Sequence, residues 1–220
     1  MAIPGDSADD NAGWSVAMSG DGTVLAVGAP GWLDDRPGYV KVYYKQLDST
    51  WLLAETFSGD SGEAAGDQFG HSVSLSEDGK TLAIGAPYND GNGGSSGHVQ
   101  VYNLVDKEWQ QLGQDINGEA AYDDSGESVS LSADGKTVAI GAYGNDGNGI
   151  NSGHVRVYHL DDSGGSSSWI QVGEDIDGVA AFDNAGWSVS LSSDGKSVAV
   201  GSPLNGNNGY RSGHVRVFGI

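Results

Sequence analysis

Cysteine is absent from this chain of 220 residues, and its absence removes several kinds of chemistry at once. Without thiols there is no disulfide framework, no thiolate metal site and no cysteine nucleophile. No apolar run approaches the roughly 20 residues that a membrane-spanning helix needs. The first residues, Met1 to Asp6, have neither the basic nor the apolar region of a signal peptide. We therefore expect no membrane insertion.

Positive charge is scarce as well. The chain has 10 Lys and Arg against 30 Asp and Glu, which gives a formal net charge of −20. Such a surface repels nucleic acid and anionic membranes, because both carry negative charge. Cations and basic protein surfaces are more natural partners, and the alternative interpretation is that the charge serves solubility alone. The sequence therefore predicts no nucleic-acid partner.

Glycine, by contrast, is abundant. There are 37 glycines and only 5 prolines, and this glycine content is more than twice the usual value of about 7%. The glycines do not follow the three-residue period of collagen. A glycine load of this kind is typical of many tight turns between short strands.

One phrase recurs four times along the chain, as GWSVAMSGDGTVLAVGAP, GHSVSLSEDGKTLAIGAP, GESVSLSADGKTVAIGAY and GWSVSLSSDGKSVAVGSP. A repeat of roughly 57 residues is the unit of the whole chain. The chain is a single repeat domain over residues 1–220, with units at 13–69, 70–125, 126–185 and 186–220. Residues 1–12 are a candidate ring-closing N-terminal segment.

The second unit illustrates the strands that each repeat predicts. Ser72–Ser76 alternates polar and apolar residues, Asp78-Gly79 is a favoured hairpin turn, and Thr81–Gly85 is the returning strand. Gly97–Tyr102 alternates again as a third strand, and Trp109–Gly113 follows as a fourth, outer strand. No segment has a helical period, so the protein is predicted to be all-β.

Four short antiparallel strands per unit, repeated radially, predict a β-propeller with four-stranded blades. A stacked β-solenoid is the competing architecture, but a unit of this length is too long for one solenoid coil. The fourth unit ends at Ile220, before its outer strand, so the last blade is predicted to lack that strand. The chain is expected to form a ring of its own, half of a homodimeric ring, or part of a larger propeller.

The stretch Asp67-Gln68-Phe69-Gly70-His71-Ser72-Val73, followed by Gly85-Ala86-Pro87, resembles the FG-GAP repeat. That family builds the seven-bladed propeller of integrin α-subunits and of many secreted proteins. The resemblance implies cell adhesion or protein binding, at an extracellular or cell-surface location. The turn Ser-x-Asp-Gly-Lys-Thr is also similar to WD-repeat propellers, and it is too short for the calcium loop of calcium-binding FG-GAP members.

The loops between the second and third strands are the predicted ligand-binding site, because they gather carboxylates and amides in every unit. The candidate residues are Trp32, Asp34, Asp35, Asn89, Asp90, Asn92, Asn145, Asp146, Asn148, Asn205 and Asn207. Asp90 and Asp146 are the candidate metal ligands, since oxygens spaced two residues apart suit Ca²⁺. The alternative is plain turn chemistry, in which Asx side chains bond their own backbone.

Other polar and aromatic residues also repeat. An acid stands three residues before each unit's first glycine, as Asp10, Asp67, Asp123 and Asp183, and is expected to accept backbone N–H bonds between blades. His98, His154 and His214 share one position and are expected to pack or hydrogen-bond, with a metal-binding trio on the ring axis as the alternative. Trp14 and Trp187 share a position held by His71 and Glu127 in the other units.

Enzyme sites need unlike groups brought together, whereas this sequence distributes the same polar residues over all its repeats. The sequence therefore predicts a non-catalytic interaction module that binds protein or glycan through inter-strand loops. One alternative is a hydrolase or lyase that acts on polysaccharide, with its site in a single divergent loop. The other is a structural repeat protein that self-assembles. No cofactor is expected apart from the calcium ion considered above.

Overall fold

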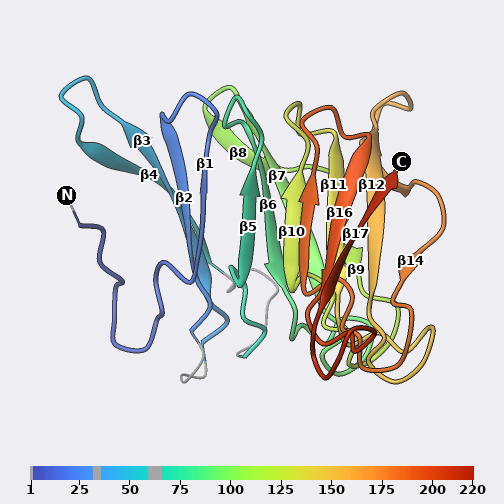
Figure 1. Ribbon diagram of the computed structural model, residues 1–220. Coiled ribbons are helices and arrows are strands. Elements are labelled where there is room, and N and C mark those ends of the chain that lie inside the picture. The colour runs from blue at the N-terminus through green and yellow to red at the C-terminus, as the bar shows by residue number, and fades with distance from the viewer. Residues whose placement is uncertain (1, 32–35, 59–65) are drawn as a thin grey trace.

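The computed structural model describes residues 2–31, 36–58 and 66–220. Every regular element in these residues is a β-strand, and the strands form four antiparallel sheets that follow one another along the chain (Figure 1). A search of the described residues finds no helix of the length and hydropathy that a bilayer crossing requires. The predicted all-β architecture is confirmed.

Each repeat unit makes one sheet. The first sheet consists of β1 (Ser15–Met18), β2 (Val24–Ala29), β3 (Tyr39–Lys45) and β4 (Trp51–Ser58). The second consists of β5 (Ser72–Leu75), β6 (Thr81–Ala86), β7 (His98–Val105), β8 (Glu108–Gln111) and β9 (Ile116–Asn117). The third consists of β10 (Ser128–Leu131), β11 (Thr137–Ala142), β12 (His154–Asp161), β13 (Ser168–Gln171) and β14 (Ile176–Asp177). The fourth consists of β15 (Ser188–Leu191), β16 (Ser197–Ser202) and β17 (His214–Gly219).

Strands pair in sequence order within each sheet, so every unit is an antiparallel meander. The fourth sheet has three strands, which confirms that its outer strand is missing from the described chain. The short strands β9 and β14 were not predicted. Each adds to the third strand of its sheet beside the fourth strand, β9 to β7 and β14 to β12. Two residues leave too little alternation in the sequence to be recognised as a strand.

The turn between the first and second strands is built from the Ser-x-Asp-Gly phrase. In the second unit the Ser76 hydroxyl donates to Asp78 Oδ1 at 2.8 Å and accepts from the Thr81 amide at 2.9 Å. Asp78 Oδ1 also accepts from the Lys80 amide at 3.0 Å, and Gly79 has φ 69°. Glycine takes this left-handed conformation without a Cβ clash. The turn therefore closes through its own side chains, and it does so in all four units.

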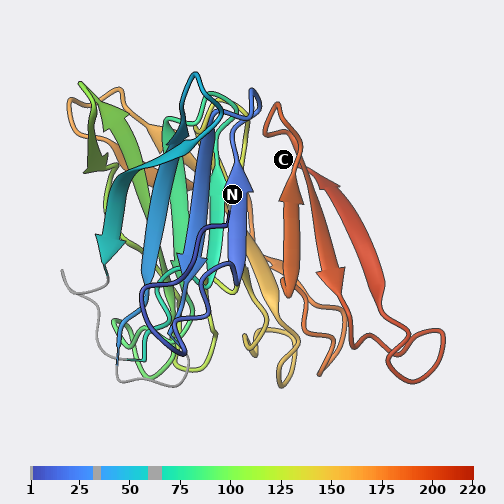
Figure 2. The same ribbon diagram turned by 90° about the vertical axis from the view of Figure 1, so that its left-hand side faces the viewer.

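The core lies between the sheets. First strands of neighbouring sheets pack side by side, and the sheets spread from them like an open fan (Figures 1 and 2). Valine pairs on the third strands fill the space between one sheet and the next: Val40 and Val42, Val99 and Val101, Val155 and Val157. All six side chains are fully or almost fully buried. Because side chains alternate between the two faces of a strand, the valines of each third strand form one apolar layer between that sheet and the next.

Each junction also brings two glycines of neighbouring units together. A Cβ added to Gly141 would lie 2.0 Å from the carbonyl oxygen of Gly186, and the same approach joins Gly28 to Gly70 and Gly85 to Gly126. The hydroxyl of Ser128 donates to that Gly186 oxygen at 2.8 Å. Ser15 and Ser72 make the matching bonds at the other two junctions, each at 2.7 Å. No side chain larger than hydrogen fits between the backbones here.

The N-terminal segment, residues 2–12, forms turns and no strand. It lies against the first sheet through Asp6, whose carboxylate pairs with Lys41 Nζ at 2.5 Å. Asp10 contacts the same sheet, since its Oδ2 accepts from the Tyr39 hydroxyl at 3.0 Å. A ring-closing role for residues 1–12 stays a prediction.

The glycine contact gives a first test, with a matched control inside the same protein. Gly141→Ala should lower the free energy of unfolding by about 1–3 kcal/mol, because the new methyl group collides with a backbone carbonyl that has no room to retreat. Gly201 holds the equivalent position in the fourth sheet, and an added Cβ there meets only atoms of Ser188 in its own sheet. Urea unfolding of dilute protein compares the two variants. Equal losses for Gly141→Ala and Gly201→Ala would contradict the contact's role.

Candidate functional site

The polar loops of the second, third and fourth units lie at one edge of the sheets. Strand direction alternates in each meander, so the loop after the second strand and the linker before the next unit's first strand reach the same edge, at the bottom of Figure 1. We call this side the loop edge. It comprises the loops at 87–97, 143–153 and 203–213 and the segments that precede the first strands, at 10–14, 66–71, 118–127 and 178–187.

The predicted site residues lie on this edge, where many of their polar atoms serve the loops themselves. The amides of Asn89, Asn145 and Asn205 are buried and donate to Asp67 Oδ2 at 2.8 Å, Asp123 Oδ2 at 3.2 Å and Asp183 Oδ2 at 2.9 Å, respectively. Each of these bonds ties a loop to the linker before its own unit. The three asparagines therefore hold the loop edge in shape.

The other candidates are exposed and bond to nearby backbone. Asp90 Oδ1 accepts from the Ser95 amide at 2.7 Å, and Asp146 Oδ1 accepts from the Asn151 amide at 2.8 Å. Asn92 and Asn148 donate from Nδ2 to the carbonyls of residues 118 and 178, at 2.9 and 2.8 Å. Asn207 is exposed, and its amide donates to the Asn205 side chain.

These bonds are the turn chemistry that the sequence offered as the alternative. Asp90 and Asp146 stand in different sheets and are not brought together as ligands of one ion. Ligand contact by this set and calcium binding by the two aspartates stay predictions. Trp32, Asp34 and Asp35 lie outside the described residues.

The repeated acids behave as expected. Oδ2 of Asp10, Asp123 and Asp183 accepts a backbone N–H three residues earlier, at 2.7, 3.0 and 3.0 Å. All four acids, Asp67 included, are buried. The prediction that they accept backbone bonds between blades is confirmed for these three.

A second feature of the loop edge is a row of side chains that stand directly before the first strands. We call Trp14, His71, Glu127 and Trp187 the entry row. The rings of Trp14 and His71 lie 5.6 Å apart, and His71 Nε2 lies 3.1 Å from Glu127 Oε2. At the far end Trp187 packs on Tyr143 with ring centroids 4.9 Å apart. The row crosses all four sheets.

Asp124 and Tyr143 complete the centre of this row. The Tyr143 hydroxyl hydrogen-bonds to the Asp124 carboxylate. Burial raises the pKa of Asp124 to about 6, and the nearby negative charge of Glu127 adds to this effect. The same burial raises the pKa of Tyr143 above its ordinary value. A carboxyl and a phenol held together in this way can donate and accept hydrogen bonds toward a polar ligand.

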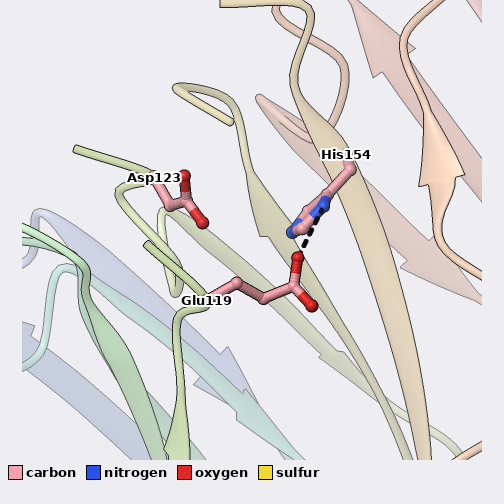
Figure 3. A group of neighbouring side chains, drawn as sticks. All are labelled: Glu119, Asp123 and His154. Atoms are coloured by element: carbon pink, nitrogen blue, oxygen red, sulfur yellow. Dashed lines mark ion pairs between the residues drawn. The ribbon is translucent and has the colours of Figure 1, made fainter. Parts of the chain in front are cut away.

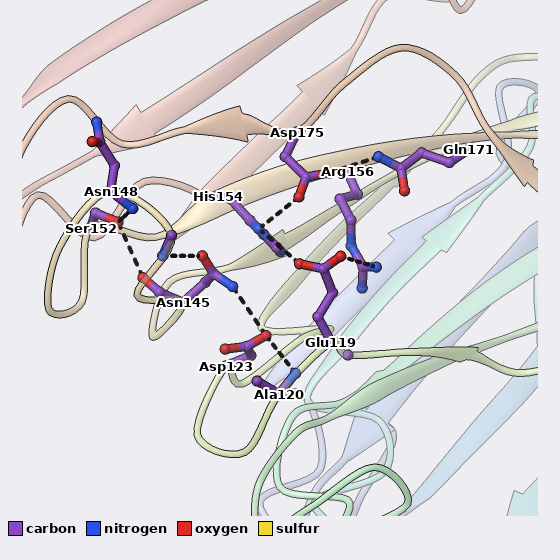
Figure 4. Close-up of polar contacts among 12 residues, drawn as sticks. Glu119, Ala120, Asp123, Asn145, Asn148, Ser152, His154, Arg156, Gln171 and Asp175 are labelled. Atoms are coloured by element: carbon purple, nitrogen blue, oxygen red, sulfur yellow. Dashed lines mark hydrogen bonds and ion pairs between the residues drawn. The ribbon is translucent and has the colours of Figure 1, made fainter.

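A third feature surrounds His154, the first residue of β12. Two groups of side chains place one ligand atom each within 4.8 Å of one another, and both contain this histidine: Glu119, Asp123 and His154 (Figure 3), and His154, Asp175 and Asp177. Burial lowers the pKa of His154 to about 4, so its imidazole is neutral at pH 7. The guanidinium of Arg156 also opposes protonation and lies 3.5 Å from Glu119 Oε1 (Figure 4).

The histidines of the three units do not share one site. His98, His154 and His214 each begin the third strand of a separate sheet, whereas the first strands line the place where the sheets meet. The alternative of an axial metal-binding trio is therefore wrong. Only the third unit surrounds its histidine with carboxylates from both neighbouring linkers among the described residues.

Comparison with known families agrees with this geometry. The FG-GAP repeat model matches residues 60–102 and 117–158. These two stretches of the chain match the FG-GAP repeat, as the sequence resemblance suggested. The sheet junction explains their two signature elements, because Phe69-Gly70 of one unit lies against Gly28-Ala29-Pro30 of the unit before it. No curated protein matches the sequence.

Solved structures extend the comparison to the whole fold. The periplasmic gluconolactonase of Pseudomonas aeruginosa is 16% identical, with a TM-score of 0.55 over 94% of this chain and 57% of its own. Hydrazine synthase of Kuenenia stuttgartiensis is 16% identical, with a TM-score of 0.58 over 100% of this chain and 49% of its own. Sqt1 of Chaetomium thermophilum is 18% identical, with a TM-score of 0.58 over 96% of this chain and 44% of its own.

These similarities confirm the β-propeller fold predicted from the repeated four-stranded units. At such low identity they concern the fold alone. The chain spans about half the length of these solved structures.

Sequence reasoning missed several residues of the loop edge. Asp124 and Tyr143 stand in positions that vary from unit to unit, and Glu119, Asp175 and Asp177 belong to linkers that were not analysed as sites. A signal was present for Asp177, which stands where the unit before has Asn117, whereas Asp175 matches Asp115 of that unit.

The raised pKa of Asp124 predicts a pH dependence of stability. A free aspartate has a pKa of about 3.9, so the folded protein holds this proton more tightly than the unfolded chain does. The stability that protonation adds is complete below about pH 4 and is lost as the pH rises through about 6. Asp124→Asn removes this loss and should make the protein about 1–2 kcal/mol more stable than the wild type at pH 7, after allowance for solvent screening.

The measurement is the free energy of unfolding of both proteins by urea between pH 4 and 7. The difference between the two curves, rather than either curve alone, isolates Asp124 from other titrating groups. Curves that stay parallel over this range would show that the carboxyl ionises as it does in the unfolded chain.

Proposed function

We propose that this chain is a non-catalytic interaction module that binds a glycan along the entry row. The observation that carries the proposal is the exposure of two tryptophan residues at the ends of that row, 50% for Trp14 and 48% for Trp187. Tryptophan faces left open to solvent are apolar surfaces on which a sugar ring stacks, and a buried packing role does not need them open.

The groups between the two tryptophans suit the rest of a sugar chain. Asp124, Glu127 and Tyr143 offer hydrogen-bond acceptors and a phenol to hydroxyl groups, within a row that is continuous across the sheets. The net charge of −20 opposes acidic polysaccharides. We therefore expect neutral or amino sugars as ligands. The FG-GAP resemblance supports placing the module outside the cell or on its surface.

The tryptophans give the test of this function. Trp14→Ala and Trp187→Ala should each weaken binding of cellohexaose or chitohexaose about tenfold, because one stacking contact is worth about 1–2 kcal/mol. Tyr210→Ala is the matched control, since Tyr210 is an exposed aromatic of the loop edge outside the row. Titration calorimetry measures affinity, and circular dichroism checks the fold.

Two outcomes would overturn the proposal. Absence of binding to either oligosaccharide, together with binding of a basic protein, would assign the row to protein recognition. Release of shortened oligosaccharide during the titration would favour the rival function, a polysaccharide hydrolase or lyase.

A second candidate function, self-assembly, is favoured by the two terminal sheet faces. Val215 and Val217 of β17 are 68% and 69% exposed, although the matching valines of the three other sheets are buried at junctions. On the first sheet Val16 of β1 is 63% exposed, and Met18 on the same face is exposed as well, whereas the matching Val129 is buried.

These two faces are the two halves of one junction that the chain already makes three times. The fourth face offers valines and the Ser188 hydroxyl, and the first face offers Val16 and the carbonyl of Gly13 in the position of Gly70. We propose that a second copy of this chain docks head to tail, its first sheet on the fourth sheet of its partner. Complementarity to itself, rather than to another protein, is what the repeat provides.

Charge substitutions on the two faces test this assembly. Light scattering of the wild type should rise from the chain mass of 22.6 kDa toward twice that mass with concentration. Val16→Lys and Val217→Lys should each stay at the lower mass, because a lysine is buried unpaired in the contact. Ile170→Lys is the control on an exposed outer strand and should behave as the wild type does.

Mixing the two lysine variants decides the geometry. A head-to-tail contact leaves one intact junction in the mixture, so a heterodimer should form where neither variant dimerises alone. A wild type that stays at the single-chain mass at its highest soluble concentration would overturn self-assembly. A mixture that stays monomeric beside a dimeric wild type would overturn the head-to-tail arrangement.

A further inference from the structure

His154 is a buried side chain without a hydrogen-bond partner. Its relative exposure is 1%, and neither Nδ1 nor Nε2 has a hydrogen-bond partner within the described residues. An unpaired buried imidazole costs free energy comparable to a lost hydrogen bond. An imidazole nitrogen without a hydrogen-bond partner is a group that a metal ion binds.

The fold presents two carboxylates to this ring, one from the neighbouring strand β14 and one from the linker just before it. His154 is the direct cross-strand partner of Asp177 in the β12–β14 pair. Directly opposed residues of an antiparallel pair share one face, and Asp175, two residues earlier, continues that face. One ligand atom of each of the three side chains lies within 4.8 Å of the others.

The distances exceed those of hydrogen bonds and fit ligands of a common ion. His154 Nδ1 lies 3.6 Å from Asp175 Oδ2 and 3.9 Å from Glu119 Oε2, and Figure 4 shows the ring held between these two carboxylates. Two ligands at about 2.0–2.1 Å from a tetrahedral zinc ion lie about 3.3 Å from each other. For His154 and Asp175 a shift of a few tenths of an ångström closes the difference, and Asp177 has a ligand atom within 4.8 Å of both.

We propose that His154, Asp175 and Asp177 form a binding site for a divalent transition metal ion of the zinc type. One imidazole and two carboxylates are a ligand set that zinc accepts, and an imidazole excludes calcium and magnesium as the preferred ions. Asp175 is already oriented by a bond from Gln171 Nε2 to its Oδ1 at 2.6 Å, which leaves Oδ2 toward the histidine. A hydrogen bond that orients a ligating carboxylate in this way is typical of metal sites.

The carboxylates on the other side of the ring are engaged elsewhere. Glu119 pairs with Arg156 at 3.5 Å, and that guanidinium repels a cation placed beside it. Asp123 Oδ2 accepts from the Ala120 amide and from Asn145 Nδ2. The ion is therefore assigned to the side of Asp175 and Asp177.

The repeat itself provides the controls. His98 holds the equivalent position in the second unit, where its cross-strand partner is Asn117 instead of an aspartate. His214 begins β17, which pairs only with β16 in the described chain. Asp177→Asn thus recreates the second unit's arrangement inside the third, and it removes a carboxylate without changing the size of the side chain.

Zinc binding by the whole chain is the experiment. Titration with Zn²⁺ alone, and with Co²⁺ for its visible absorption, should give one ion per chain with the intense spectrum of a tetrahedral site. His154→Asn and Asp177→Asn should each weaken zinc binding more than about tenfold. Loss of a residue that only hydrogen-bonds to a ligand already lowers metal affinity about 10- to 100-fold. His214→Asn should leave the affinity unchanged.

If His154→Asn fails to fold, Asp177→Asn and Asp175→Asn decide the question alone, because both stand near the surface. The proposal is overturned if the wild type binds no zinc in the micromolar range. It is overturned equally if binding survives Asp177→Asn undiminished, since the ion would then sit among surface carboxylates. Loss of binding in His214→Asn would move the site to the fourth sheet.

Discussion

The structure depends on one contact, the approach of the carbonyl of Gly70, Gly126 or Gly186 to the backbone of a glycine in the preceding sheet. A serine hydroxyl of that sheet donates to the same oxygen. This contact sets how closely the first strands lie and, through them, the distance at which the valine layers meet. Because a methyl group would separate the backbones, glycine is required by space rather than by conformation at the receiving position. The Gly-Ala and Phe-Gly elements of the repeat are the two sides of this contact.

A fixed junction has consequences for the loop edge. Neighbouring units are related by nearly the same step each time, so side chains at equivalent positions fall into rows across the sheets. Trp14, His71, Glu127 and Trp187 form such a row although four different units supply them. The repeated asparagine–aspartate bonds stabilise the loops, which lets the exposed residues between them vary without loss of shape. The residues that repeat in every unit thus stabilise the fold, and the residues that differ between units provide the functional groups of the loop edge.

The third unit shows this division most clearly. Its histidine occupies a position that is the same in two other units, yet among the described residues only this histidine has an aspartate, Asp177, as its direct cross-strand partner. One substitution in the linker relative to the second unit, aspartate at 177 where the second unit has Asn117, places a second carboxylate beside the histidine. The cost of burying an unpaired imidazole is acceptable only if something compensates for it. A metal ion bound between the ring and the aspartates is such a compensation.

The sequence by itself determined the all-β class, the four units, the order of the strands and the Asp-Gly turns. These follow from local periodicity and from turn chemistry, which act between residues near each other in the chain. The structural role of the acids before each unit was predictable for the same reason. Tertiary structure alone decided which groups meet at the loop edge. Asp124 and Tyr143, or His154 and Asp177, are brought together by strand pairing and sheet junctions, and no local pattern records their distance. The two open valine faces likewise became visible only once burial distinguished the terminal sheets from the inner ones, since the valines themselves are identical in the sequence.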